Sequence, residues 1–112
     1  MAIATPHTQV FGGIVMRATL LDAVGATGDG EWIDVSGLRT SSVHVIITAT
    51  APMLLRGSNE PTKPANNTHG FSLQTHTVTG GGIIEVPCNW VKAYVSAWTS
   101  GTVTCYFYGV NN

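Results

Sequence analysis

The chain has 112 residues and a formal net charge of −1, and only 10% of its residues are charged, whereas about 25% is usual for a soluble domain. This length predicts one domain with a core of its own. Lysines and arginines occur singly, which argues against a nucleic-acid-binding surface, and no apolar run approaches the roughly 20 residues of a membrane-spanning helix.

The first segment, residues 1–13, is predicted to be an extended arm rather than a strand. Pro6 and the Gly12-Gly13 pair interrupt it, and its polar residues follow no period. The segment also lacks the basic start and apolar core of a secretion signal, so we expect synthesis in the cytoplasm. We therefore predict an N-terminal arm over 1–13 and a β domain over 14–112.

Short alternating segments separated by Gly and Pro follow the arm, and none has a helical apolar period of useful length. The predicted strands before the C-terminal region are 14–21, 31–35, 40–50, 53–58, 71–79 and 83–86. Residues 22–30 are expected to form a Gly-rich loop, and Gly80-Gly81-Gly82 a turn. Seven or eight short strands with such turns favour an all-β fold, a single β-sandwich of jelly-roll or Greek-key type.

The C-terminal region predicts a closing β-hairpin. Residues 90–98 alternate with period two, a Thr-Ser-Gly turn follows, and residues 102–108 alternate again. One face is apolar: Val91, Ala93, Val95, Ala97, Val103, Cys105 and Phe107. The opposite face carries Lys92 and an expected aromatic patch of Tyr94, Trp98, Tyr106 and Tyr108. We expect this patch to pack against a neighbouring subunit, with sugar stacking as the alternative.

The longest predicted loop, residues 59–70, contains Pro61 and Pro64 and no apolar pattern. Loops of about a dozen residues in compact domains tend to carry function. The fifteen threonines favour strands with a neutral, hydroxylated outer face. Because a free monomer usually needs more surface charge to stay dispersed, we expect neighbouring subunits to cover much of the surface.

No constellation of catalytic or metal-binding residues is recognisable. The four histidines, His7, His44, His69 and His76, lack metal-ligand spacing. The acidic residues around the Gly-rich loop, Asp22, Asp29, Glu31 and Asp34, do not follow the EF-hand pattern, so we interpret them as solvated loop residues. We therefore expect no enzymatic activity, no metal and no cofactor.

The two cysteines, Cys88 and Cys105, are expected to be free thiols because no secretion signal precedes them. A disulfide across the last two strands stays open as an alternative. Cys105 occupies an inward position of its strand, and we expect it to be a small core residue.

Three stretches occur in a familiar order: Gly30-Glu-Trp-Ile-Asp-Val-Ser-Gly37 with the run that begins at Thr40, then Leu55-Arg-Gly-Ser-Asn59, and last Val91 to Thr104. In these the chain resembles the small β-sandwich structural proteins of tailed bacteriophages. The resemblance covers roughly residues 30–59 and 83–108. The chain departs from the pattern of these proteins at residues 60–70, where a proline-rich loop from Glu60 to Gly70 replaces their short turn. The partner contacts of this region therefore stay open.

The resemblance implies a head decoration, or cement, protein on the outer surface of the virion. Its partners would be the major capsid protein and further copies of itself, in a homotrimer. An alternative is a glycan-binding or adaptor module of a phage tail or head appendage. The residues expected to contact partners are Ile3, Pro6, His7, Val10 and Phe11 of the arm, Pro61 and Pro64 of the loop, and Tyr94, Trp98, Tyr106 and Tyr108 of the hairpin.

Overall fold

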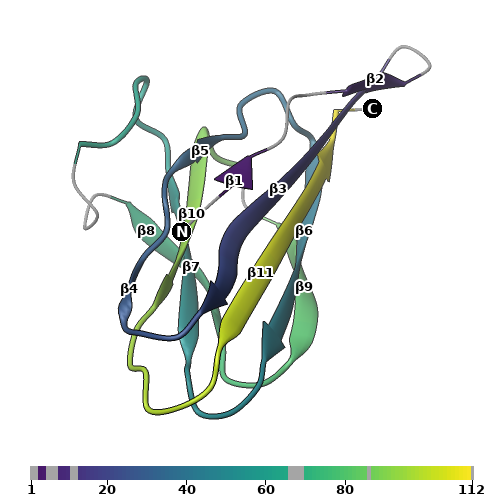
Figure 1. The fold of residues 1–112 in the computed structure, drawn as a ribbon. Coiled ribbons are helices and arrows are strands. Elements are labelled where there is room, and N and C mark those ends of the chain that lie inside the picture. Colours follow the sequence, from purple (N-terminus) through teal and green to yellow (C-terminus); the bar gives the residue numbers. More distant parts are fainter. Residues whose placement is uncertain (1–2, 5–7, 11–12, 66–69, 86, 112) are drawn as a thin grey trace.

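The computed structural model describes residues 3–4, 8–10, 13–65, 70–85 and 87–111, which form eleven strands (Figure 1). The strands are β1 (Ile3–Ala4), β2 (Thr8–Val10), β3 (Gly13–Val24), β4 (Gly28–Asp29), β5 (Ile33–Asp34), β6 (Thr40–Ile47), β7 (Met53–Ser58), β8 (Phe71–His76), β9 (Gly80–Ile84), β10 (Trp90–Val95) and β11 (Val103–Val110). The predicted strand 53–58 coincides with β7. Other predicted strands differ from the observed ones by a few residues at their ends.

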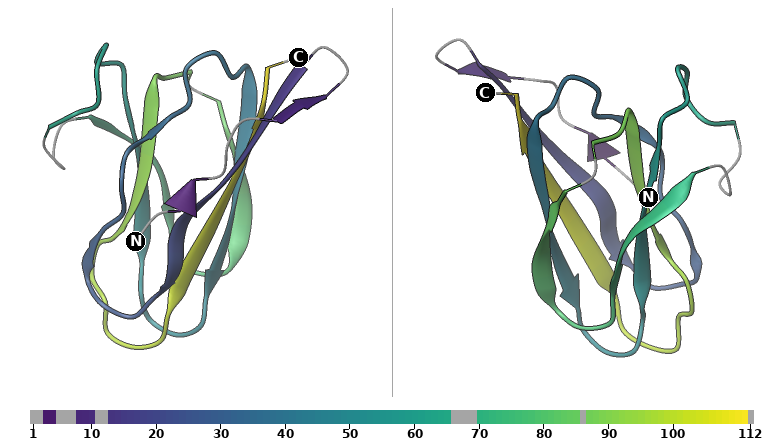
Figure 2. Two further views of the ribbon diagram at one scale, coloured as in Figure 1. Left: turned by 45° about the horizontal axis from the view of Figure 1, so that its top comes forward. Right: turned by 180° about the vertical axis from the view of Figure 1, so that it is seen from behind.

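Two antiparallel sheets pack face to face, which confirms the predicted β-sandwich (Figure 2). In the first sheet, here called sheet A, the order is β1-β3-β11-β6-β9, and β2 also pairs with β3. The order in sheet B is β4-β10-β7-β8, and β5 also pairs with β10. The chain passes between the sheets after β3, β5, β6, β8, β9 and β10, and this order is that of a jelly roll.

The core lies between the sheets and is built by the inward positions of the alternating strands. Val91, Ala93 and Val95 of β10 are fully or almost fully buried, and so are Val103 and Cys105 of β11. The alternation of the sequence therefore identified the inward faces correctly, because a strand with one apolar face buries that face whichever sheet it joins.

The prediction of a hairpin between residues 90–98 and 102–108 is wrong. Strand β10 pairs with β7, β4 and β5 in sheet B, whereas β11 pairs with β3 and β6 in sheet A. The connection is an arch between the two sheets, so the apolar faces of its two strands face each other across the core. Alternation around a turn is compatible with both arrangements, since it does not specify the partner strand.

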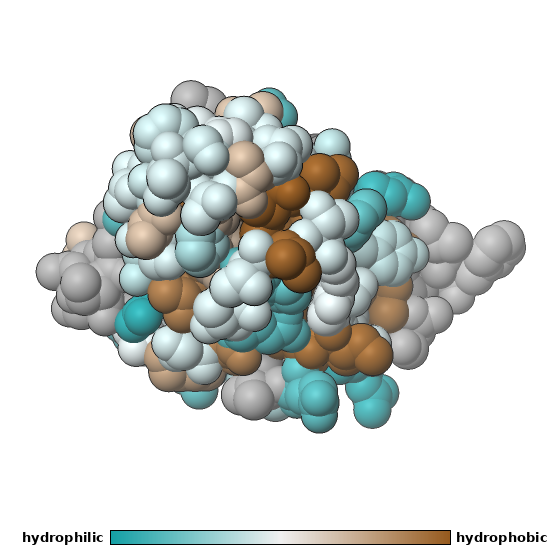
Figure 3. Space-filling view, turned by 90° about the horizontal axis from the view of Figure 1, so that it is seen from below, coloured by the Kyte–Doolittle hydropathy of each residue, from teal (hydrophilic) through white to brown (hydrophobic). Residues whose placement is uncertain are grey.

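Hydrogen bonds between connections hold this arch against the neighbouring one from β6 to β7. The amides of Ser96 and Thr99 donate to the carbonyl oxygens of Pro52 and Thr50, each over 2.9 Å. Thr48 and Thr102 also join the two arches, because the Thr102 amide donates to Thr48 Oγ1 over 2.8 Å. This end of the sandwich, seen from below, shows mostly pale surface of near-neutral hydropathy with scattered apolar areas (Figure 3).

The three glycines predicted as a turn belong to strand β9. Gly80, Gly81 and Gly82 lie opposite Val45, His44 and Val43 of β6. A Cβ on Gly82 would come within 2.5 Å of Gln74 Oε1, and Gln74 Nε2 donates to the Ile83 carbonyl over 2.8 Å. Glycine in this strand therefore makes room for a side chain from the opposite sheet.

The predicted arm is attached to the edge of sheet A in two places. Strand β1 pairs with β3 at Thr19 and Ala18, and β2 pairs with the first residues of β3. The expectation that residues 1–13 contain no strand is therefore wrong at these positions. Strand β2 and the described part of the long loop, residues 59–65, lie at the same end of the sandwich, opposite the arches (Figures 1 and 2).

Candidate functional site

The structure separates the four aromatic residues that the sequence grouped into one patch. Tyr106 and Tyr108 lie on the outer face of sheet A, whereas Tyr94 belongs to sheet B and Trp98 to the arch between β10 and β11. The separation follows directly from the arch, since β10 and β11 do not share a sheet. The predicted common aromatic patch is therefore wrong.

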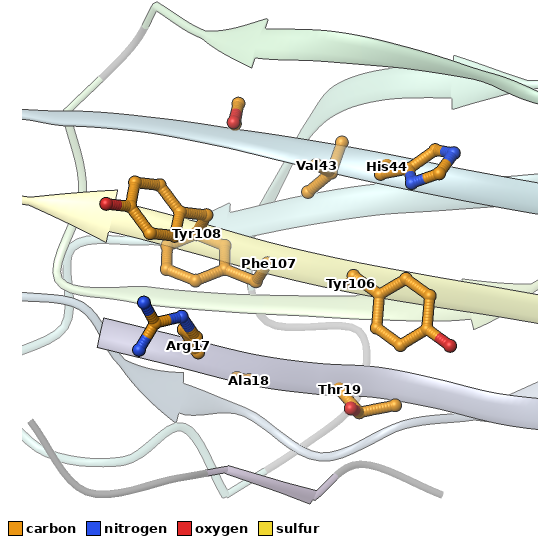
Figure 4. A pocket seen from close by; sticks show the side chains of 9 residues that line it. Arg17, Ala18, Thr19, Val43, His44, Tyr106, Phe107 and Tyr108 are labelled. Carbon is orange, nitrogen blue, oxygen red and sulfur yellow. The ribbon is translucent and has the colours of Figure 1, made fainter. Parts of the chain in front are cut away.

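Tyr106 and Tyr108 border a groove of about 460 Å³ across three strands of sheet A (Figure 4). Their side chains are 46% and 45% exposed, although both sit on a central strand. The strand register places Tyr106 between Thr19 of β3 and His44 of β6, and it places Tyr108 between Arg17 and Ser42. Two cross-strand rows of three residues thus border the groove, and Ala18, Phe107 and Val43 line it between these rows.

The rings in the groove contact polar and charged neighbours. The His44 and Tyr106 rings lie 6.2 Å apart between centroids at an interplanar angle of 46°. Arg17 Cζ lies 5.7 Å from the centroid of the Tyr108 ring, within the range of a cation–π contact. Among the described residues that line the groove are Arg17 and His44, but no aspartate or glutamate.

The outer face of sheet B holds a buried lysine instead of an open aromatic patch. Lys92 lies on the face opposite the core, as predicted, yet its side chain is 0% exposed. Its Nζ lies 2.6 Å from Asp29 Oδ1 and 5.4 and 5.6 Å from the ring centroids of Trp32 and Tyr94. Tyr94 is half-buried, so this residue supports an internal ion pair.

Trp98 remains 40% exposed, but its two N–H groups donate to other parts of the protein. Its Nε1 donates to the Gly101 carbonyl over 2.9 Å, and its amide donates to Thr27 Oγ1 over 2.9 Å. Gly101 has a φ of +86°, and a Cβ there would lie 2.6 Å from Ala49 Cβ. Trp98 thus closes a tight turn that requires glycine.

The long loop is fixed to sheet B at both ends. Trp90 Nε1 donates to the Glu60 carbonyl over 3.0 Å, and Arg56 Nη2 donates to the Gly70 carbonyl over 3.0 Å. Pro61 is exposed, whereas Pro64 is buried. In this loop, Pro61 is therefore accessible from solvent and Pro64 is not.

Five predicted contact residues belong to the N-terminal segment. Pro6, His7 and Phe11 lie outside the described residues, and for Ile3 and Val10 the structure describes the backbone only. Ile3 lies opposite Thr19, and Val10 lies opposite Gly13. Both positions pair with β3 on its side away from β11.

Both cysteines are free thiols, as expected, and Cys105 is fully buried. Burial raises the pKa of the Cys105 thiol to about 12. Burial also raises the pKa of Cys88, and a hydrogen bond with the backbone of Ser58 opposes this shift. Because the thiolate is the reactive form, burial protects Cys105 both sterically and by suppressing ionisation.

We expect a thiol reagent at about pH 8 to modify Cys88 well before Cys105. The measurement is the mass of the modified folded protein over time, with urea-unfolded protein as the reference in which both thiols react. Because burial keeps the Cys105 thiol protonated in the folded chain whereas an unfolded thiol ionises at a pKa of about 8.5, Cys105 leaves stability unchanged below that pH and lowers it progressively as the pH rises toward about 12. Equal labelling of both cysteines in the folded chain would contradict the buried position of Cys105.

The acidic residues around the Gly-rich loop do not form a metal-binding group. Within the described ranges, no cluster of three or more His, Cys, Asp or Glu side chains is placed to hold a metal ion. Asp29 pairs with Lys92, and Asp34 Oδ1 accepts hydrogen bonds from the Ser36 amide and hydroxyl. In the same part of the chain, no helix is long and apolar enough to cross a membrane.

Sequence reasoning missed the residues that accompany the two tyrosines in the groove. Arg17 and Thr19 alternate with buried Met16 and Ala18, and Ser42 and His44 alternate with buried Val43 and Val45. Alternation therefore gave the outward face of each strand. It did not reveal that β3 and β6 flank β11, because strand order is set by contacts that are distant in sequence.

No protein-family model matches this chain, and no curated protein matches it. Among solved structures, the SPBc2 prophage-derived protein YomS superposes with a TM-score of 0.67 at 17% identity, covering 92% of this chain and 98% of YomS. A cupin domain from Bordetella pertussis Tohama I has a TM-score of 0.42 at 15% identity, covering 96% of this chain and 92% of that one. Peruvianin-I, a cysteine peptidase from Thevetia peruviana latex, has a TM-score of 0.38 at 18% identity, covering 89% of this chain and 50% of its own. The likeness to YomS extends over nearly the whole of both chains and shows a shared fold.

Proposed function

We propose that this chain is a phage structural protein without enzymatic activity, a decoration protein that binds the outer surface of the assembled head. The observation that carries the proposal is the likeness to YomS, a prophage-derived protein, over 92% of this chain and 98% of that one. The sparse charge of the chain, 10% of its residues, adds support because neutral surfaces suit contacts between subunits.

The arrangement of the projecting segments supports a contact at one end of the sandwich. Strand β2 and loop residues 59–65 both lie at the end opposite the arches (Figure 2). Exposed Pro61 lies in this loop. In the proposed mode, this end contacts the major capsid protein, and further copies of the chain complete a homotrimer.

Binding of this kind stabilises the shell by mass action. A protein that binds the assembled shell and not its separate subunits shifts the equilibrium toward the assembled state. Many copies on one particle add their contributions, so each single contact can remain small. The role requires contact surfaces and no catalytic group.

We expect mass spectrometry of gradient-purified particles, from cells that encode this chain, to find it in amounts comparable with the major capsid protein. A chain that lacks residues 1–10 is expected to sediment with the particles in reduced amount, because it loses both β1 and β2. The Val78→Ser variant is the control, since Val78 is 70% exposed on the turn between β8 and β9. Absence of the chain from purified particles would disprove the structural role, and full occupancy by the truncated chain would disprove the contact through this segment. Sedimentation equilibrium of the free protein tests the trimer.

A further inference from the structure

A pocket smaller than the groove on sheet A opens at the end of the sandwich opposite the arches. It has a volume of about 290 Å³ and lies between two connections, the one from β5 to β6 and the one from β9 to β10. Strands β6 and β10 begin beside it, at Thr40 and Trp90, and run toward the arches. The pocket therefore belongs to the same end as β2 and loop residues 59–65 (Figures 1 and 2).

The interior of this pocket is apolar. Val35, Ile84 and Val91 line it, and all three are buried. Leu38 and Cys88 also line it, and both are half-buried and pack against the core. The pocket thus leads from the solvent to the core between the sheets, and an apolar side chain that enters it gains free energy by leaving water.

Backbone hydrogen bonds hold the walls of the pocket in place. The Val35 amide donates to the Asn89 carbonyl over 2.8 Å, which joins the two connections. The Leu38 amide donates to the Val35 carbonyl over 3.2 Å, and the Arg39 amide donates to the Val110 carbonyl over 2.8 Å. Because the pocket is formed before a ligand arrives, little conformational entropy of the walls is lost on binding.

The pocket is linked to the loop that is proposed to contact the shell. The Asn89 amide donates to the Ser58 carbonyl over 3.0 Å, and Asn89 Nδ2 donates to the Asn59 carbonyl over 3.1 Å. Exposed Pro61 follows two residues after Asn59. A partner that covers the base of this loop therefore lies next to the pocket.

Two charged side chains of opposite sign border the pocket. Arg39 and Glu85 line it, and both are exposed. Among the residues that the structure describes, neither forms an ion pair. A docking partner removes water from such charges, and burying a charge without a counter-charge is unfavourable. The pocket therefore favours a partner that places a carboxylate beside Arg39 and a cation beside Glu85.

We infer that this pocket receives an apolar side chain of the major capsid protein, from a segment in which an acidic and a basic residue flank that side chain. The apolar group fills the space beside Leu38 and Cys88, and the flanking charges pair with Arg39 and Glu85. Buried anchors surrounded by polar contacts carry most of the binding energy in many interfaces. The inference rests on the proposed function, because it requires this end of the sandwich to face the shell.

Cys88 reports whether the pocket is filled. We expect iodoacetamide at about pH 8 to modify Cys88 of the particle-bound chain at least about tenfold more slowly than Cys88 of the free protein, because the thiol borders the filled space. Mass spectrometry of the chain recovered from particles measures the rate. Equal rates on particles and in solution would overturn the inference and leave the proposed function standing, whereas absence of the chain from particles would reject both.

Rebinding of the purified chain to particles that lack it separates filling of the pocket from covering of it. A benzylthio group attached to Cys88 through a disulfide occupies the pocket, and we expect it to weaken rebinding at least about tenfold. Reduction releases the group and is expected to restore rebinding to the level of the untreated chain, which is the control. Undiminished rebinding of the benzylthio-modified chain would show that nothing enters the pocket.

Charge variants test the flanking residues of the partner in the same rebinding assay. Arg39→Gln and Glu85→Gln are each expected to weaken rebinding about tenfold. Asp22→Asn is the matched control, because it removes one exposed carboxylate near Val24, which pairs with Val103 beside the arch. It is expected to rebind normally. Full rebinding of both pocket variants, or an equal loss in Asp22→Asn, would reject the charge pairing. An amide NMR spectrum of each variant verifies that the sandwich is intact.

Discussion

The Asp29→Ala variant is expected to lose about 3 kcal/mol of its free energy of unfolding. The change removes the carboxylate whose Oδ1 lies 2.6 Å from Lys92 Nζ and leaves an ammonium group that is 0% exposed. Removing one partner of a buried ion pair typically costs about 3–5 kcal/mol. We take the lower end because the Asp29 side chain is 33% exposed, and because the rings of Trp32 and Tyr94 still face the cation.

The position of Arg56 increases the expected effect. Arg56 lies directly opposite Lys92 in the pairing of β7 with β10, and like charges opposite each other in a sheet destabilise it. Without Asp29, Lys92 loses the carboxylate that pairs with it. Urea unfolding followed by tryptophan fluorescence measures the loss.

Two further variants distinguish an ion-pair effect from general damage to strand β4. Lys92→Met is expected to cost less than Asp29→Ala, because methionine fills an apolar site and the partly exposed carboxylate of Asp29 can hydrate. The double variant is expected to be more stable than Asp29→Ala alone, since it no longer buries an unpaired charge. Asp22→Ala, at an exposed position of β3, is the acidic control, with an expected change within about 0.5 kcal/mol. Strictly additive losses in the double variant would contradict the pair.

The Phe107→Ala variant is expected to lose about 3–5 kcal/mol of its free energy of unfolding, whereas Tyr106→Ala, one residue away, loses at most about 1 kcal/mol. Phe107 is 2% exposed in the core, and Tyr106 is 46% exposed on the outer face. Truncating Phe107 leaves a cavity between the sheets, where it lies level with Ala18 and Val43 in the strand register. Truncating Tyr106 opens no cavity.

The contrast between the two neighbours tests the orientation of β11 and hence the identity of the groove. Thermal or urea unfolding of both variants under identical conditions provides the measurement. Phe107→Leu is a milder control that removes less volume and is expected to fall between them. A larger loss for Tyr106→Ala than for Phe107→Ala would mean that β11 presents its other face to the core, and the groove beside Tyr106 would then not lie on the outer surface.

The alternation of apolar and polar residues predicted several strands and their inward faces correctly. It predicted the strand 53–58 at its observed bounds, and it placed Cys105 in the core. It also placed Lys92 and Tyr106 on outward faces. These are local properties, because successive side chains of a strand point to opposite sides regardless of what the strand pairs with.

The glycines illustrate where local reasoning failed. Three in succession predicted a turn, yet Gly80, Gly81 and Gly82 pair with β6 inside a strand. The reason lies in the other sheet, where Gln74 occupies the space that a side chain at Gly82 would need. In the sequence, glycines that allow a close approach between segments look the same as glycines in a turn.

By itself, then, the sequence determined that this protein is a β-sandwich and which side of most strands faces the core. Only the tertiary structure decided that β10 and β11 lie in different sheets, that Lys92 is buried beside Asp29, and that Tyr106 lies between Thr19 and His44. Whether a side chain is buried depends on its own polarity, which the sequence gives directly. Which strands pair depends on backbone hydrogen bonds, and every strand has the same backbone donors and acceptors. Because the arch carries the chain from sheet B to sheet A, β11 lies between β3 and β6, and the residues of the groove come together. The arrangement of these strands arises from packing between segments far apart in the chain.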